Sequence, residues 1–220
     1  MPDTPRMTEG YRILSLDDIE PVYADRQEAK LLAVRRALGI TAFGTNAWLG
    51  DTGERVVPPH EEDSGNEELY IVVRGSATFT IGVAEHAAAA GTLVYIEPEQ
   101  HRVAVAAEDG TIVLAVGATR GKPFTVHGWD DFTVAAGLRN AGRNEEARAA
   151  LADAVAGNDE AWGLNYNLAC WESLDGNPDA AFNLLRRAME LDEGEVRKWA
   201  AEDTDLDPLR EDPRWKELFG

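Results

Sequence analysis

The chain has 220 residues, 44% of them hydrophobic, which allows one large globular domain or two small ones. Forty acidic residues face 21 basic ones, and the net charge of −19 disfavours binding to nucleic acid or to an anionic membrane surface. No segment approaches the ~20 apolar residues of a membrane span, and the N-terminal residues show no secretion signal. Because Cys170 is the single cysteine, no internal disulfide can form, and we expect a cytoplasmic protein.

The first fifty residues predict a helix between less regular segments. Residues 1–10 read as a loose tail and residues 11–19 as a short strand. In residues 25–38 apolar side chains recur at helical spacing, and Gly39 stands where a helix end is expected. Residues 40–49 then take the pattern of an extended segment.

Residues 54–119 predict a series of short strands. In residues 76–83 apolar and polar side chains alternate, as they do in a half-buried strand. Arg74 and Gly75 predict a hairpin-like turn between this strand and the preceding one, residues 68–73. Short strands with glycine-containing turns and no intervening helix predict an antiparallel sandwich or barrel.

The composition changes near Gly121, and the chain becomes rich in alanine and leucine. This part repeats with an offset of 34 residues. The matching positions are Gly142 with Gly176, Ala147 with Ala181, Leu151 with Leu185, and Ala154 with Ala188. The pattern resembles tetratricopeptide repeats over roughly residues 129–219, which implies an all-α module that binds a protein partner. We therefore expect two domains, residues 1–122 and 123–220.

Two stretches of the first domain, residues 59–75 and 91–102, resemble the paired motifs of the cupin family. Intact motifs read G-x5-H-x-H-x3/4-E-x6-G and G-x5-P-x-G-x2-H-x3-N. The positions that match are His60, Glu68, Gly75, Gly91, Pro98 and His101. Glu62 replaces the second histidine of the first motif, and His101 comes one residue early. The resemblance implies an α+β chain: an N-terminal antiparallel β-barrel of the cupin type, a double-stranded β-helix, followed by the tetratricopeptide-like helical module.

The same resemblance implies a metal site made of His60, Glu62, Glu68 and His101. Imidazoles and carboxylates together suit a divalent transition metal such as Fe, Mn, Ni or Zn, and a 2-His-1-carboxylate set leaves positions open for oxygen or substrate. The alternative is a barrel without a metal or any other cofactor. In that case His101 and Glu68 hydrogen-bond each other or bind a ligand directly. The altered motif spacings favour this alternative, because metal sites tolerate only small displacements.

Further residues are candidates for the pocket. Strand alternation places Tyr70 on the same face as Glu68 and opposite to Glu67, although the sequence leaves open which face is interior. Arg102 ends the second motif stretch and Arg74 lies in the first, and each of them either holds an anionic ligand or forms a salt bridge at the rim.

Three functions follow from these patterns. The barrel binds a small molecule as a sensor or carrier, or it is a metal-dependent dioxygenase or isomerase with His60, Glu68 and His101 as ligands. In the third, the helical module recruits a protein while the barrel forms a homodimer. In the enzyme hypothesis Glu62 is either a fourth ligand or a general base, and the catalytic residues stay unknown.

Overall fold

The computed structural model describes residues 10–23, 29–62, 65–124, 126, 128–158 and 160–220. The chain divides into two compact units. The first, here called the β-unit, comprises Met1–Thr125 and Ala136–Gly142, and the second, the helical unit, comprises Val126–Ala135 and Arg143–Gly220. The domain boundary expected after residue 122 stays a prediction.

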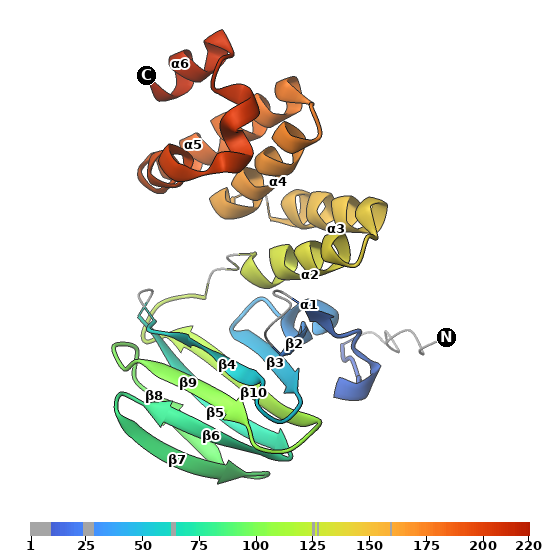
Figure 1. Cartoon of the computed structure of the whole chain (residues 1–220), viewed down its shortest axis with the longest axis vertical. Coiled ribbons are helices and arrows are strands. Elements are labelled where there is room, and N and C mark those ends of the chain that lie inside the picture. Colours follow the sequence, from blue (N-terminus) through green and yellow to red (C-terminus); the bar gives the residue numbers. More distant parts are fainter. Residues whose placement is uncertain (1–9, 24–28, 63–64, 125, 127, 159) are drawn as a thin grey trace. The chain divides into compact units, whose positions relative to one another are not determined.

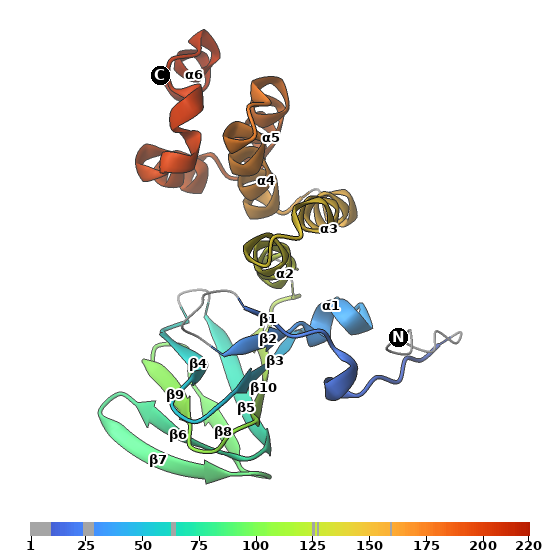
Figure 2. The same cartoon turned by 45° about the vertical axis from the view of Figure 1, so that its right-hand side comes forward.

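Among the described residues, the strands of the β-unit form two antiparallel sheets (Figures 1 and 2). The six-stranded sheet has the order β1-β2-β3-β10-β5-β8, and the four-stranded sheet has the order β4-β9-β6-β7. The bounds are β1 Val22–Tyr23, β2 Lys30–Leu32, β3 Gly44–Gly50, β4 Arg55–His60, β5 Asn66–Arg74, β6 Ser76–Ile81, β7 Ala84–Ala89, β8 Leu93–Ile96, β9 Arg102–Ala106 and β10 Thr111–Thr119. The antiparallel β fold is confirmed. A closed barrel is not found in this described part of the chain, because its strands belong to two separate sheets.

The inner faces of the two sheets form the core of the β-unit. Tyr70 and Val72 of β5 are buried, and the ring of Tyr70 lies 5.8 Å from that of Phe79, which β6 contributes from the other sheet. In β9, Ala104 and Ala106 are buried in the same alternating way. The face of β5 that the sequence left undecided is therefore settled, and Glu68 shares the interior face with Tyr70.

The turn at Gly75 does not close a hairpin, and this sequence prediction is wrong. Strand β5 pairs with β10 and β8, whereas β6 pairs with β7 and β9. The chain therefore crosses from one sheet to the other at Gly75. This residue has φ +70°, and a Cβ there would lie 2.4 Å from Oγ1 of Thr111. The crossing needs the same turn residue as a hairpin, so local sequence does not separate the two.

The helix expected over residues 25–38 is wrong in its first half. Residues 24–28 lie outside the described part, Lys30–Leu32 form β2, and helix α1 covers only Val34–Leu38. Leu31 and Leu32 are buried because β2 extends the sheet beside β3, and this burial outweighs local helix propensity. Gly39 ends α1 in the left-handed region, as expected.

The strand expected over residues 11–19 is also wrong. A short 3-10 helix, Leu16–Asp18, lies there, and the hydroxyl of Ser15 caps its start. The extended pattern of residues 40–49 corresponds to β3, which begins at Gly44.

Helices make up the second half of the chain. They are α2 Trp129–Asn140, α3 Asn144–Gly157, α4 Trp162–Leu174, α5 Pro178–Glu202, the 3-10 helix η2 Thr204–Leu209, and α6 Pro213–Phe219. Helix α5 is interrupted at Asp192, which has non-helical dihedral angles and whose carboxylate accepts a hydrogen bond from the amide of Glu195. Among the described helices, none combines the length and apolarity needed to cross a membrane.

The 34-residue repeat has a structural counterpart. Gly142 and Gly176 both have φ +77° in the turns that precede α3 and α5. The paired positions that follow them are fully buried in both helices: Ala147 with Ala181, and Leu151 with Leu185. Helices α3 and α5 therefore share their preceding turn and these buried positions, and kinship with tetratricopeptide repeats stays a prediction.

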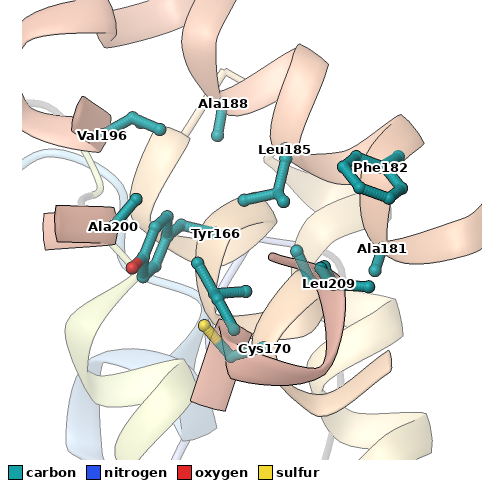
Figure 3. Close-up of a cluster of buried hydrophobic side chains, with 11 residues drawn as sticks. Tyr166, Cys170, Ala181, Phe182, Leu185, Ala188, Val196, Ala200 and Leu209 are labelled. Atoms are coloured by element: carbon teal, nitrogen blue, oxygen red, sulfur yellow. The ribbon is translucent and has the colours of Figure 1, made fainter. Parts of the chain in front are cut away.

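A hydrophobic core holds the end of the helical unit together (Figure 3). Tyr166 and Cys170 of α4 lie between the two parts of α5 and the 3-10 helix η2, with the hydroxyl and the thiol at the edge of the cluster. The labelled partners are Ala181, Phe182, Leu185, Ala188, Val196, Ala200 and Leu209.

Candidate functional site

Three side chains of the β-unit bring potential metal ligands together. His60 ends β4, Glu62 follows it, and Glu68 lies in β5 on the opposite sheet. Nε2 of His60 lies 3.3 Å from Oε2 of Glu68 and 3.7 Å from Oε1 of Glu62. All three ligand atoms lie within 4.8 Å of one another. The structure thus brings together three of the four residues that the sequence predicted as ligands.

The ring of His60 is fixed by its other nitrogen. Nδ1 lies 2.7 Å from the carbonyl oxygen of Pro58, which can only accept, so Nδ1 carries a proton and donates it. Nε2 is therefore the atom that faces the two carboxylates. A ligand histidine held in this way has its tautomer and orientation set in advance.

Glu68 receives donors from both sheets. The Tyr70 hydroxyl donates to Oε2 over 2.5 Å, and Nε of Arg102 lies 3.6 Å from the same oxygen. Burial opposes ionisation of Glu68, but the hydrogen bonds from His60 and Tyr70 and the charge of Arg102 outweigh it and hold its pKa below 4.5. The hydrogen bond to Glu68 raises the pKa of His60 above 6.5. The contact therefore stabilises the imidazolium form of His60 and the carboxylate form of Glu68.

Glu62 is oriented by polar neighbours on β5 and β10. Its Oε2 accepts a hydrogen bond of 3.2 Å from the amide of Asn66, and Asn66 in turn accepts one from the hydroxyl of Thr119. The main-chain amide of Glu62 donates to the carbonyl of Pro98. This network holds Oε1 toward His60.

Arg102 is fully buried, so its predicted alternative of a rim salt bridge is wrong. Its terminal nitrogens donate to the carbonyl oxygens of Glu97 and Pro98, over 2.9 and 3.3 Å. The guanidinium thereby ties the turn before β9 to the carboxylate of Glu68. Arg74, by contrast, forms an exposed salt bridge of 3.0 Å with Asp17.

His101 is the predicted ligand that the structure does not bring into the group. Its side chain is exposed, and the group found among the described residues contains His60, Glu62 and Glu68 only. Arg102, one position later, is the cross-strand partner of His60. Successive residues of a strand face opposite sides, so a shift of one residue exchanges an imidazole for a guanidinium at the inner position.

Sequence reasoning missed the neighbours of Glu68 and Tyr70 across the sheet. Across the sheet, the register partner of Glu68 is Gly117 of β10, and that of Gly117 is Gly44 of β3. In the same way Tyr70 is followed by Ala115 of β10 and Asn46 of β3. A Cβ at Gly117 would lie 3.4 Å from Cγ of Glu68. Because the pairing of β3, β10 and β5 is non-local, no spacing along the chain reveals this neighbourhood.

The outer face of β5 carries a second polar group. Glu67 accepts a hydrogen bond of 2.7 Å from the hydroxyl of Tyr95 and forms an ion pair with Arg120, and these contacts lower its pKa. An open hollow of about 330 Å³ lies here, lined by Gly65, Glu67, Glu97, Pro98, Glu99, Gln100 and Arg120. Its lining does not include His60, Glu62 or Glu68.

The three ligand atoms fit a divalent transition metal. The set offers one imidazole nitrogen, whose tautomer is fixed, and two carboxylates. Glu68 and Glu62 are each hydrogen-bonded by a further residue, Tyr70 and Asn66 respectively, which is the arrangement expected around metal ligands. Three protein ligands leave positions for water or a small molecule.

No protein-family model matches this sequence, and no curated protein matches it. The chain is similar to solved structures of cupin-fold proteins. One is a cupin protein from Bacteroides fragilis, at 21% identity and a TM-score of 0.42, covering 54% of this chain and 92% of that one. Another is a sugar phosphate isomerase of the cupin superfamily from Silicibacter pomeroyi, at 22% identity and a TM-score of 0.41, covering 48% of this chain and 74% of that one. A third is a predicted oxalate decarboxylase from Thermotoga maritima, at 16% identity and a TM-score of 0.40, covering 49% of this chain and 98% of that one. Likeness at this level assigns no activity to the chain.

Proposed function

We propose that the β-unit binds one divalent transition metal through His60, Glu62 and Glu68 and holds a small molecule beside it. The observation that carries this proposal is that one ligand atom each from His60, Glu62 and Glu68 lie within 4.8 Å of one another. When bound, the metal would act as a Lewis acid that polarises an oxygen of the small molecule. The chain itself contributes the fixed imidazole, the two oriented carboxylates and the Tyr70 hydroxyl donating to Glu68.

His101 has no part in this proposal. The ligand set becomes one histidine and two glutamates, in place of the two histidines expected from the motifs. The choice among Fe, Mn, Ni and Zn belongs to the proposal too, since imidazole with carboxylates suits each of these ions.

A second candidate is ligand binding without a metal, as a sensor or carrier. One observation favours it: Oε2 of Glu68 already accepts a hydrogen bond from Tyr70 and lies 3.3 Å from Nε2 of His60 and 3.6 Å from Nε of Arg102. In that case the protonated His60 and Arg102 supply the positive charge that a metal would otherwise bring.

Metal titration of the full chain separates the two candidates. The protein is prepared without a histidine tag, stripped with a chelator, and titrated calorimetrically with Mn²⁺ and Zn²⁺. The metal proposal predicts one site per chain, and loss of at least about 10-fold in affinity in Glu68→Gln. Glu67→Gln is the matched control, because it removes the same charge from the neighbouring position on the outer face. Equal affinities in the two variants, or no saturable binding, would leave the metal-free candidate.

A further inference from the structure

Arg102 carries a charge in a place where a charge is costly. Its side chain is fully buried, and Nε has no hydrogen-bond partner. Among the described side chains, one other buried polar atom shares this condition, Oδ1 of Asn46. A buried cation is retained only where a negative group compensates it, and the carboxylate nearest to Nε is Glu68, at 3.6 Å.

The balance of charge at the site depends on whether a metal is present. Without metal, the charge of Arg102 is compensated by the carboxylate of Glu68. With a divalent metal, the two carboxylates are neutralised by the ion and His60 binds as a neutral imidazole. The charge of Arg102, whose side chain is fully buried, is then left unbalanced, and electrostatic interactions are strong at a buried position.

We infer that Arg102 makes the metal-loaded site select a small monoanion, the carboxylate of a small acid, over a neutral molecule of the same size. This inference rests on the proposed function and names its ligand class. Arg102 acts as a specificity-determining residue through its field and through Glu68. Its terminal nitrogens are already engaged by the carbonyl groups of Glu97 and Pro98, which keep the charge in place.

Acetate and acetamide test the selection, because they share a shape and differ in charge. Mn²⁺ is loaded into the full chain, and the paramagnetic relaxation of the methyl protons is measured as each probe is titrated. We expect saturable relaxation of acetate by the loaded protein, and an affinity for acetamide that is weaker by about 10-fold or more. Equal affinities for the two probes would overturn the inference even if Mn²⁺ is bound. If the unaltered chain binds no Mn²⁺, the proposed function fails first.

Substitutions then assign the effect to Arg102. Arg102→Met is expected to bind Mn²⁺ at least as tightly as the parent, because a like charge is gone, and to lose about 10-fold or more in acetate affinity. Arg102→Lys keeps the charge and is expected to keep the preference for acetate. Arg120→Met, which removes a charge from the outer face, is the control. If Arg102 had only a structural role, Arg102→Met would lower the affinities for Mn²⁺ and for acetate together. That result, or an unchanged affinity for acetate, contradicts the assignment. If Arg102→Met does not fold, the affinities of the parent chain and of Arg102→Lys for acetate and acetamide still test the inference.

Discussion

Arg102 of β9 is the cross-strand partner of His60 of β4, and both side chains approach the same oxygen of Glu68 on the facing sheet, to 3.6 and 3.3 Å. The candidate site is therefore also a polar connection between the two sheets. Because Arg102 is buried and always charged, the carboxylate of Glu68 serves the fold as well as any ligand.

Replacing Glu68 by Gln should destabilise the β-unit even without a ligand. The change leaves the buried guanidinium of Arg102 uncompensated, and breaking a buried pair from one side costs about 3 kcal/mol or more. Urea unfolding of the chelator-treated chain measures the free energy of unfolding. Glu67→Gln should change it by less than about 1 kcal/mol, because Glu67 forms an exposed pair with Arg120. Similar losses in both variants would show that Glu68 does not compensate Arg102.

The metal-free protein should depend on pH through His60. Its pKa in the folded state is raised above 6.5, mainly by the hydrogen bond to Glu68, so folding favours the protonated ring. The stabilisation is fully present below pH 6.5 and is lost as the pH rises through the raised pKa. Glu68 stays ionised across this window, since its pKa lies below 4.5.

Unfolding of the parent chain and of His60→Gln, measured with chelator from about pH 5.5 to pH 8.5, checks this dependence. The difference in unfolding free energy should be largest at the acidic end and shrink toward the alkaline end. The control is His86→Gln, because His86 is exposed in β7. It measures how the loss of a surface imidazole changes the unfolding free energy. A difference that is flat or grows with pH contradicts the proposed contact.

Local patterns predicted the antiparallel strands after residue 65 and the face of β5 on which Glu68 lies. Alternation placed Glu68 with Tyr70, and motif spacing selected Glu68 over Glu67, which the structure finds on the outer face with Tyr95 and Arg120. A site residue could be predicted only where the sequence shows which residues of its strand face the interior. His101 and Arg102 are neighbours in the sequence. Because β9 begins at Arg102 with its side chain buried, Arg102 faces inward in place of His101.

Longer-range pairing was beyond local patterns. Gly75 has the turn chemistry of a hairpin, but the chain changes sheets there. Leu31 and Leu32 suit a helix, and pairing with β3 makes them a strand. In both places the partner strand, which lies elsewhere in the sequence, determines the structure.

A side chain at Gly117 should disturb the position of Glu68. The two residues are register partners, and a Cβ at Gly117 would lie 3.3 Å from the carbonyl oxygen of Glu67 and 3.4 Å from Cγ of Glu68. Gly117→Ala is therefore expected to displace Glu68 and to lower metal affinity about 10-fold, by the titration described above. Ala118→Val adds bulk at the next position, whose partner is Glu67, and should leave the affinity unchanged. Unaltered binding in Gly117→Ala would show that Glu68 tolerates the shift.

Cys170 in the helical unit should be unreactive because it is buried and lies beside Asp203. The thiol is buried, and its Sγ lies 3.5 Å from Oδ2 of Asp203, which also accepts a hydrogen bond of 2.9 Å from the Tyr166 hydroxyl. Burial raises the pKa of the thiol, and the negative charge of Asp203 raises it further. Since the thiolate is the reactive form, we expect dithionitrobenzoate to label Cys170 at pH 8 only when the protein is unfolded in urea.

The substitution Asp203→Asn separates charge from structure at this position. Asp203 caps η2 by accepting from the amide of Asp205, and Asn is an equally good N-cap residue, so the helix start is kept. Loss of the charge should lower the thiol pKa toward its ordinary value, so labelling should be at least about 10-fold faster without a matching fall in the free energy of unfolding. Asp207→Asn removes an exposed charge from the same 3-10 helix, where it pairs with Arg210, and should label at the parent's rate. If Asp203→Asn is no faster than Asp207→Asn, burial alone accounts for the protection of Cys170.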